Sequence, residues 1–287
     1  MNQIKHIVLP CVGLTALSLV APFAIGDDPR EDAPNRRSNV QRGARERPEP
    51  PRGGGDRSPA TFPDEYRTLD GTANNGDHPL WGAAGTELWR RTPVGYADGA
   101  GEPAGPDRPS ARVVSNAVFA QASDQPLPEG YSDMLWQWGQ FLDHDITETP
   151  VTDPGTAFDI EVPAGDPWFD PDGTGTVTIP LDRSAGIDVD GVREQLNNIT
   201  AFIDASNVYG SDDTRALALR TLDGTGRLAT SAGDLMPFNT VGLHNAPDSD
   251  DPTFFLAGDI RANEQVGLIA LHTLFVREHN RLAGLIA

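Results

Sequence analysis

The chain has 287 residues, 38% of them hydrophobic, which suffices for one large or two small folded domains, while 30 glycines and 25 prolines predict much irregular backbone. Its 42 acidic and 22 basic residues give a net charge of −20, and this acidic balance argues against nucleic acid as a partner. The charge fits a calcium-rich exterior, although ordinary solubility explains it equally well.

Residues 1–26 are typical of a secretory signal peptide. Lys5 lies in a short polar start, residues 7–23 are apolar, and small residues precede Asp27. A membrane-spanning helix is the weaker interpretation, because the apolar run holds two prolines and is followed by an acid rather than by a basic stop signal. The mature protein is therefore expected to be secreted, extracellular or periplasmic, without stable membrane insertion. Cys11, the only cysteine, leaves with the signal, so the mature chain has no disulfides.

The remainder is expected to form a linker and one domain. Residues 27–60 are rich in charged residues, Pro and Gly and have almost no large apolar side chain, which predicts a disordered linker before a domain at 61–287. The elements expected in that domain are, in chain order, an ordered loop at 66–90, an extended wrap at 93–115, a helix around 136–145, a short strand pair within 160–180, a helix start at 193–196, a helix at 214–222 and a long helix at 264–287.

The final helix ends without a stop signal. Its last residues, Leu285, Ile286 and Ala287, carry no cap, no proline and no charge. This pattern predicts a helix that continues, so the chain is expected to be the amino-terminal part of a longer domain.

The segment Trp136–Asp145 (WQWGQFLDHD) holds more residues suited to chemistry than any other. It has no proline, and its apolar residues are sufficient for a buried helix. On such a helix Gln140 and His144 share one face, while Asp143 and Asp145 point about 100° to either side of His144. His144 can therefore face a pocket while its acidic neighbours address different sides, although a lone histidine is more often a hydrogen-bonded core residue.

A second segment, DIRANE (259–264), carries an arginine in apolar surroundings. Arg261 and Glu264 are three residues apart and can face the same way on a helix. Burying a guanidinium without a partner is costly, so Arg261 needs either a catalytic partner such as His144 or a salt bridge to Asp143 or Glu264. Both interpretations remain open on this pattern.

A third segment, TAFIDAS (200–206), alternates polar and apolar residues. In extended backbone its alternate side chains share one side, giving two hydroxyls, one carboxylate and a backbone carbonyl. These are hard oxygen ligands of the kind that Ca²⁺ binds, and Asp145 would add a second carboxylate. A polar strand edge is the alternative. The four candidates within the segment are Thr200, Phe202, Asp204 and Ser206.

An acidic segment at 170–174 superficially resembles a calcium-binding loop. It contains Asp170, Asp172 and Thr174 but lacks the distant glutamate of an EF-hand, so the pattern argues against one.

Several motifs resemble the animal-type haem peroxidases of the peroxidase–cyclooxygenase superfamily. They are WGQFLDHD, REQLNNITAFIDASNVYGS (193–211), FLAGDIRANE (255–264) and LHTLFVREHNRLA (271–283), with YRTLDGTANN and VVSNAV nearer the amino terminus. They occur in consistent order over residues 65–287. The resemblance implies a mainly α, loop-rich haem peroxidase fold, of which only the amino-terminal portion is present.

The resemblance also implies roles for individual residues. His144 and Arg261 resemble the distal catalytic pair, with Gln140 lining the same pocket, and Asp143 and Glu264 match positions that can be ester-linked to haem b. The implied Ca²⁺ ligands are Asp145, Thr200, Phe202, Asp204 and Ser206.

The sequence departs from the family pattern in places. Gln265 stands where some members have a haem-linked methionine, so no sulfonium bond is expected. Glu148 replaces an aromatic residue at the cavity edge, which puts a halide preference in doubt. No counterpart of the proximal histidine is present, because His272 and His279 fall on a structural helix. This chain alone is therefore expected to hold haem poorly.

The function implied is that of a secreted, calcium-binding haem peroxidase. Its partners would be hydrogen peroxide and a small reducing substrate, a phenol or a halide, and not nucleic acid. The alternatives are a fatty-acid dioxygenase on the same scaffold and a haem-free calcium-binding adhesion module.

Overall fold

A computed structural model describes residues 67–287, except 106, 129, 152–154 and 247–248. All of these residues belong to one unit, Ser58–Ala287, and the expected signal peptide and linker lie outside the described residues. The elements are β1 (Thr86–Glu87), α1 (Ala111–Phe119), α2 (Met134–Ile146), β2 (Ile160–Glu161), β3 (Thr178–Ile179), β4 (Gly186–Val189), β5 (Val192–Asn197), α3 (Ser206–Tyr209), α4 (Asp213–Ala218) and α5 (Val266–Ile286). Only 25% of the structure is helical, so the expected loop-rich character holds, whereas "mainly α" holds only in part.

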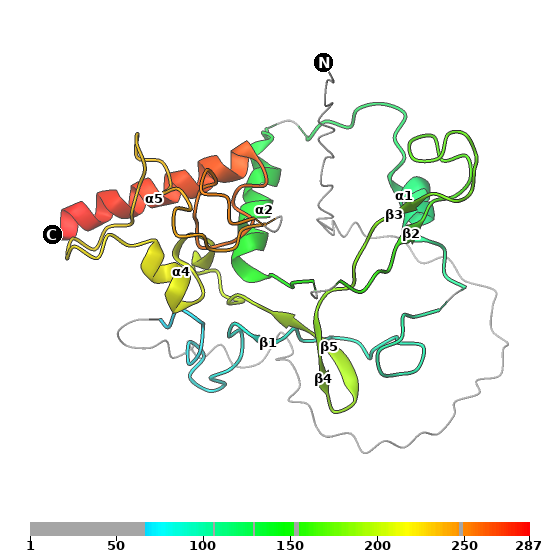
Figure 1. The fold of residues 1–287 in the computed structure, drawn as a ribbon, viewed down its shortest axis with the longest axis horizontal. Helices are drawn as coiled ribbons and strands as arrows, with labels where there is room; N and C mark the ends of the chain where they lie inside the picture. The colour runs from blue at the N-terminus through cyan, green and yellow to red at the C-terminus, as the bar shows by residue number, and fades with distance from the viewer. Residues whose placement is uncertain (1–66, 106, 129, 152–154, 247–248) are drawn as a thin grey trace. The chain divides into compact units, whose positions relative to one another are not determined.

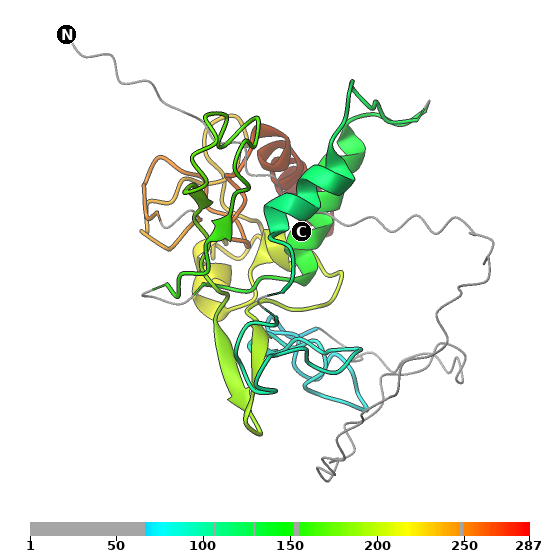
Figure 2. The same cartoon turned by 90° about the vertical axis from the view of Figure 1, so that its right-hand side faces the viewer.

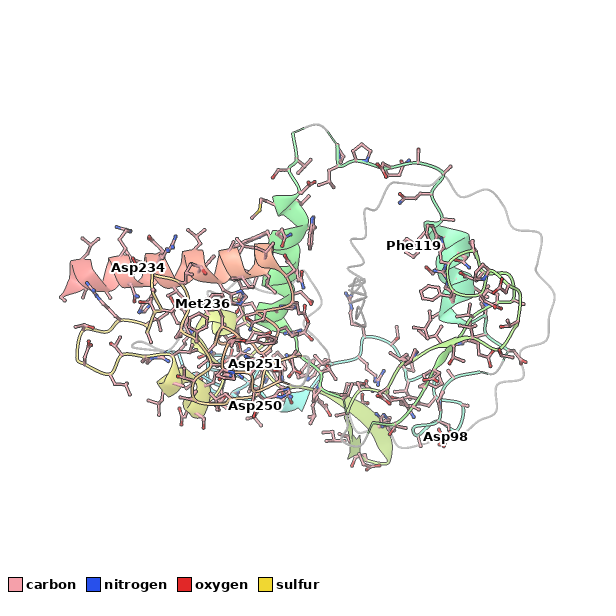
Figure 3. The ribbon with its side chains drawn as sticks, turned by 45° about the horizontal axis from the view of Figure 1, so that its top comes forward. Asp98, Phe119, Asp234, Met236, Asp250 and Asp251 are labelled. Carbon is pink, nitrogen blue, oxygen red and sulfur yellow. The ribbon has the colours of Figure 1, made fainter. Side chains whose placement is uncertain are left out.

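The core forms where α5 packs against α2 (Figure 1). Phe141 of α2 lies between His272 and Phe275 of α5, with ring centroids 4.9 Å apart in both pairs. Helix α3 contacts both long helices, and Met236, which is fully buried, lies close to α5 (Figure 3). Both long helices were expected from the sequence. No described helix combines the length and apolar character that a membrane crossing needs.

The prediction of a helix start at 193–196 is wrong. These residues belong to β5, which pairs with β4 in an antiparallel hairpin, and with β1 on its other side (Figure 2). The two hairpin strands are joined by Asp190 and Gly191, which have φ values of +54° and +83°. Two such residues fit the tight turn that matches the twist of a hairpin, and Asp-Gly between alternating residues is its usual signal. That signal was present in the sequence.

The expectation of an extended segment at 200–206 is also wrong. Residues 201–204 bend, Ala205 adopts a left-handed conformation with φ +59°, and α3 starts at Ser206. Hydrogen bonds from Asp204 and Ala205 to the carboxylate of Asp145 hold this bend, so tertiary contacts override the alternating pattern.

Two further expectations, a strand pair and a helix, hold with shifted bounds. The short strand pair within 160–180 is β2 and β3, and the helix expected at 214–222 is the shorter α4. Helix α1 was missed within the expected wrap at 93–115, although Ser110 caps its amino terminus by accepting a hydrogen bond from the Val113 amide. Arg261 and Glu264 lie in a turn before α5 rather than on that helix.

Candidate active site

Helix α2 places the central residue of the site. His144 stands near its carboxyl end and is only 4% exposed, on the side of the turn that precedes α5. The helix ends at Ile146, where Thr147 turns into extended backbone and its amide donates back to the carbonyl of Asp143. Because α2 continues to Ile146, His144 lies within regular helix. The next residue, Thr147, accepts a hydrogen bond from Arg261 through its carbonyl.

His144 lies between two carboxylates. Its Nδ1 is 3.9 Å from Oδ1 of Asp259, and its Nε2 is 3.7 Å from Oε2 of Glu264. Nδ1 is buried and has no hydrogen-bond partner. Burial, followed by the nearby charge of Arg261, lowers the pKa of His144 from 6.5 to about 4, against the opposing effect of Asp259. The imidazole is therefore neutral at neutral pH, which is the form that can accept a proton.

Arg261 is held by Asp259 in a buried, bidentate ion pair. Its Nε and one terminal nitrogen donate to the two carboxylate oxygens at 2.9 and 2.7 Å, and the same terminal nitrogen also donates to the carbonyl of Thr147 at 2.8 Å. Burial opposes the charge of Arg261, but Asp259 outweighs burial and raises the pKa of Arg261. Arg261 therefore does form a salt bridge, but with Asp259 rather than with Asp143 or Glu264, the two partners named in that alternative.

Gln140 and Glu264 join the same site. Nε2 of Gln140 donates to Oε2 of Glu264 at 2.8 Å, and Nε2 of Gln265 donates to Oε1 of Gln140 at 3.2 Å. Burial raises the pKa of Glu264, and it does the same for Asp143 and Glu148, while Arg261 acts in the opposite direction on all three. The structure thus brings together all five residues expected around the haem: Gln140, Asp143, His144, Arg261 and Glu264.

A second cluster, here called the oxygen cluster, lies at the end of α2 and consists of Asp145, Thr200, Asp204 and Ser206. Thr200 donates to Oδ2 of Asp204 at 3.0 Å and lies 3.4 Å from the hydroxyl of Ser206. The hydroxyl of Ser206 lies 3.3 Å from Oδ1 of Asp145. Burial, and to a lesser extent the charge of Asp204, raises the pKa of Asp145. The hydrogen bonds that its carboxylate accepts from Ala205, Asn207 and Ser206 act in the opposite direction. Four of the five expected calcium ligands therefore converge.

The fifth expected ligand, Phe202, differs from the other four because only its backbone carbonyl was expected as a donor. Its ring packs against Gly82, where an added Cβ would lie 2.9 Å from the ring. A cation of the protein also reaches this cluster, because Arg67 donates to Oδ2 of Asp204 at 2.9 Å. Within the described residues no group of three or more His, Cys, Asp or Glu side chains is arranged to hold a metal, and the oxygen cluster has only two carboxylates.

The sequence reasoning missed three residues that position the site. Asp259 holds Arg261, Arg67 holds Asp204, and Asn207 links α3 to both α2 and Asp259. Asp259 had a usable signal, since an acid two residues before a buried arginine is a natural partner. Arg67 and Asn207 act over long sequence separations and had none.

The comparison with known proteins settles the family. The family model described as animal haem peroxidase matches residues 66–287. The chain belongs to the animal haem peroxidase family. Its relatives include the peroxidasin homolog of Mus musculus, which is 36% identical over 270 residues covering 78% of this chain and 18% of the relative. Myeloperoxidase of Mus musculus is 36% identical over 264 residues, covering 77% of this chain and 36% of that protein. The chain therefore spans well under two thirds of these relatives.

Solved structures agree on the fold. Peroxidase A from Dictyostelium discoideum superposes with a TM-score of 0.67 at 30% identity, over 77% of this chain and 46% of that one. A fatty acid alpha-dioxygenase from Oryza sativa superposes with a TM-score of 0.56 at 25% identity, over 79% of this chain and 34% of that one. The described residues therefore have a peroxidase fold whose scaffold also occurs in dioxygenases.

Proposed function

We propose that this chain belongs to a secreted, calcium-supported haem peroxidase that reduces hydrogen peroxide and oxidises small donors such as phenols or halides. The observation that carries this proposal is the pairing, at one buried site, of a neutral imidazole with a guanidinium fixed on a carboxylate. General acid–base catalysis and stabilisation of developing negative charge need these two groups at close range.

The residues around His144 fit haem b. Asp143 and Glu264 are partly buried carboxyl groups on the same site, and burial raises the pKa of both. An environment that favours an uncharged carboxyl group also favours an uncharged ester, which supports these two residues as attachment points. Nε2 of His144, 3.7 Å from Oε2 of Glu264, is the ring nitrogen on the side of Glu264.

When bound, haem would supply the redox chemistry that cleaves the peroxide bond. His144 would accept the proton of the entering peroxide and return it to the departing oxygen. Because Nδ1 is enclosed, Nε2, on the side of Glu264, is the atom that exchanges this proton. Arg261 stays charged at any working pH and stabilises the negative charge that develops on oxygen. Gln140, hydrogen-bonded to Glu264, completes the polar lining.

Calcium fits the oxygen cluster, with the carbonyl of Phe202 as a fifth donor. The hydroxyl of Thr200 lies 3.0 Å from Asp204 and 3.4 Å from Ser206, and the hydroxyl of Ser206 lies 3.3 Å from Asp145. These carboxylate and hydroxyl oxygens are of the kind that Ca²⁺ binds, about six to eight at a time. Asp145 and its neighbour His144 share α2, so an ion on Asp145 would restrain the histidine. Secretion rests on the signal-like pattern of residues 1–26, followed by a linker at 27–60.

The decisive experiment replaces His144 by Ala in the longest natural form of the protein. Loss of the acid–base group is expected to slow peroxide reduction with a phenolic donor by about 100-fold or more. The matched control, His78→Ala, changes an exposed histidine and should retain wild-type rates. A His144→Ala protein that binds haem and keeps the wild-type rate would refute the proposal.

A fatty-acid dioxygenase is the second candidate, and the superposition on the Oryza sativa dioxygenase favours it. The higher identity and TM-score with Peroxidase A rank it below a peroxidase. Oxygen uptake with a polyunsaturated fatty acid, without turnover of peroxide donors, would reverse this order. Absence of a haem absorption band after reconstitution of the full-length protein would favour the third option, a haem-free calcium-binding module.

A further inference from the structure

Asn207 occupies a junction between the two clusters. It lies in α3, is 1% exposed, and its backbone amide donates to Oδ1 of Asp145 at 3.3 Å. Its side-chain Nδ2 donates to the carbonyl of Phe141 in α2 at 2.8 Å. Its own carbonyl accepts the amide of Asp259 at 2.8 Å. One buried residue therefore contacts the oxygen cluster, the helix that carries His144 and the residue that holds Arg261.

The segment that precedes Asp259 lies in close backbone contact with α3. An added Cβ on Gly258 would lie 2.5 Å from the amide nitrogen of Gly210 and 2.7 Å from the carbonyl oxygen of Asn207. Both contacts are with backbone, which cannot move aside as a flexible side chain can. A shift of α3 on α2 would therefore displace the segment that carries Asp259 and Arg261 relative to His144.

The side chain of Asn207 makes the bond from this residue to the backbone of α2, whereas its own backbone amide donates to the side chain of Asp145 on the same helix. The side-chain bond is buried, and Oδ1 of the same amide has no partner, so Nδ2 is the side-chain atom that links α3 to α2. The backbone bonds to Asp145 and Asp259 would survive a substitution, whereas the bond to Phe141 would not. A substitution here therefore releases one contact between α3 and α2.

We propose that Asn207 is a positioning residue that sets the separation between His144 and Arg261, and that calcium in the oxygen cluster restrains the same α2–α3 contact. An ion shared by Asp145 of α2 and Ser206 of α3 would hold the two elements together one helical turn beyond Phe141, whose carbonyl accepts from the side chain of Asn207. This inference rests on the proposed function. The hydrogen bond of Asn207 and the calcium ion then act as partly redundant restraints on the α2–α3 contact, so the contact depends more on one of them when the other is lost.

The test uses Asn207→Leu, which keeps the shape of the side chain and removes its donor. Its control, Asn197→Leu, removes another buried amide that donates to an α2 carbonyl, that of Ile146 at 2.9 Å, but comes from β5 rather than α3. If Asn207→Leu does not fold, Asn207→Ser provides a smaller polar replacement whose hydroxyl is too short to reach Phe141.

Hydrogen exchange of the Asp259 amide is the primary measurement, because it needs neither haem nor activity. Asn207→Leu is expected to speed this exchange about tenfold beyond any change in global stability, the effect of about one hydrogen bond, and Asn197→Leu is not. Added calcium should restore part of the protection in Asn207→Leu, and a calcium titration followed by terbium luminescence should show weaker binding. In the haem-loaded full-length protein kcat should fall while KM for the donor stays near wild type.

Equal protection of Asp259 in Asn207→Leu and Asn197→Leu, after correction for global stability, would overturn the proposal. A loss of protection that calcium does not change would overturn its calcium part. If the protein binds no haem and turns over no peroxide, the proposed function fails, but the exchange measurement still decides whether Asn207 positions the Asp259–Arg261 segment.

Discussion

The buried ion pair of the site gives the sharpest prediction. The side chain of Asp259 is 1% exposed and that of Arg261 17%, and two hydrogen bonds of 2.7 and 2.9 Å join them. Asp259 also accepts the backbone amide of Arg261 at 2.8 Å. The change Asp259→Asn keeps the size and shape of the side chain and removes its charge, so it leaves a largely buried guanidinium without the counter-ion to which it is hydrogen-bonded.

The size of the effect follows from what remains around Arg261. Removing one partner of a buried pair costs about 3–5 kcal/mol of unfolding free energy, because the other charge stays buried and uncompensated. Here the carbonyl of Thr147 still accepts from Arg261, and the charge of Glu148 lies near enough to favour the guanidinium. These neighbours place the expected loss near the lower end of that range, at about 3 kcal/mol.

Arg281 and Glu278 provide the matched control. They form a pair at the same 2.7 Å distance, but their side chains are 58% and 51% exposed. Water screens exposed charges, so Glu278→Gln is expected to change stability little. Urea unfolding followed by tryptophan fluorescence measures both variants at neutral pH. If Asp259→Asn costs no more than Glu278→Gln, then Arg261 does not depend on Asp259 and the geometry of the site has been misread.

Three further predictions concern the same unit. The depressed pKa of His144, about 4 against an ordinary 6.5, means that the unfolded chain takes up its proton first, so stability is lost as pH falls from 6.5 toward 4. The loss of unfolding free energy should reach about 3 kcal/mol. It is measured from urea midpoints over this pH range, where the midpoint of wild type should fall relative to that of His144→Gln. Gly258→Ala should destabilise the chain strongly because the added Cβ meets backbone, whereas Gly139→Ala, with nothing within 4 Å in α2, should stabilise it slightly in thermal unfolding. Calcium removal from the full-length protein should lower Tm, and Asp145→Asn should abolish this response; an unchanged Tm in wild type would argue against a calcium ion there.

Residues recognised by their own chemistry could be predicted from the sequence. Arg261 stands out by its own chemistry, because a guanidinium in apolar surroundings needs a partner. The role expected for His144 comes instead from the family motif that contains it. The apolar content of Trp136–Asp145 and the length of the last apolar segment predicted α2 and α5 almost to their ends. In these elements local propensity and tertiary packing favour the same structure.

Residues recognised only through their contacts could not be predicted. Nothing adjacent in the sequence marks Asn207 as a link between Phe141 and Asp259, because its function lies in hydrogen bonds to distant backbone. The bend at 200–206 was missed for the same reason, since the carboxylate of Asp145 determines it. The hairpin at Asp190-Gly191 is different, because its turn signal is local and stands in the sequence directly before residues 193–196.

Acidic residues serve two purposes in this chain, and the net charge of −20 does not separate them. Carboxylates in the loops, such as Asp98 and Asp251 (Figure 3), accept nearby backbone amides, and these bonds lower their pKa. Around Arg261 burial instead raises the pKa of Asp143, Glu148 and Glu264. The loop carboxylates stabilise the turns that contain them, whereas those around Arg261, including the partly exposed Glu264, lie where desolvation opposes ionisation. Three carboxyl groups with raised pKa beside one guanidinium and a neutral, buried histidine form the combination that marks a candidate reactive site rather than an acidic surface.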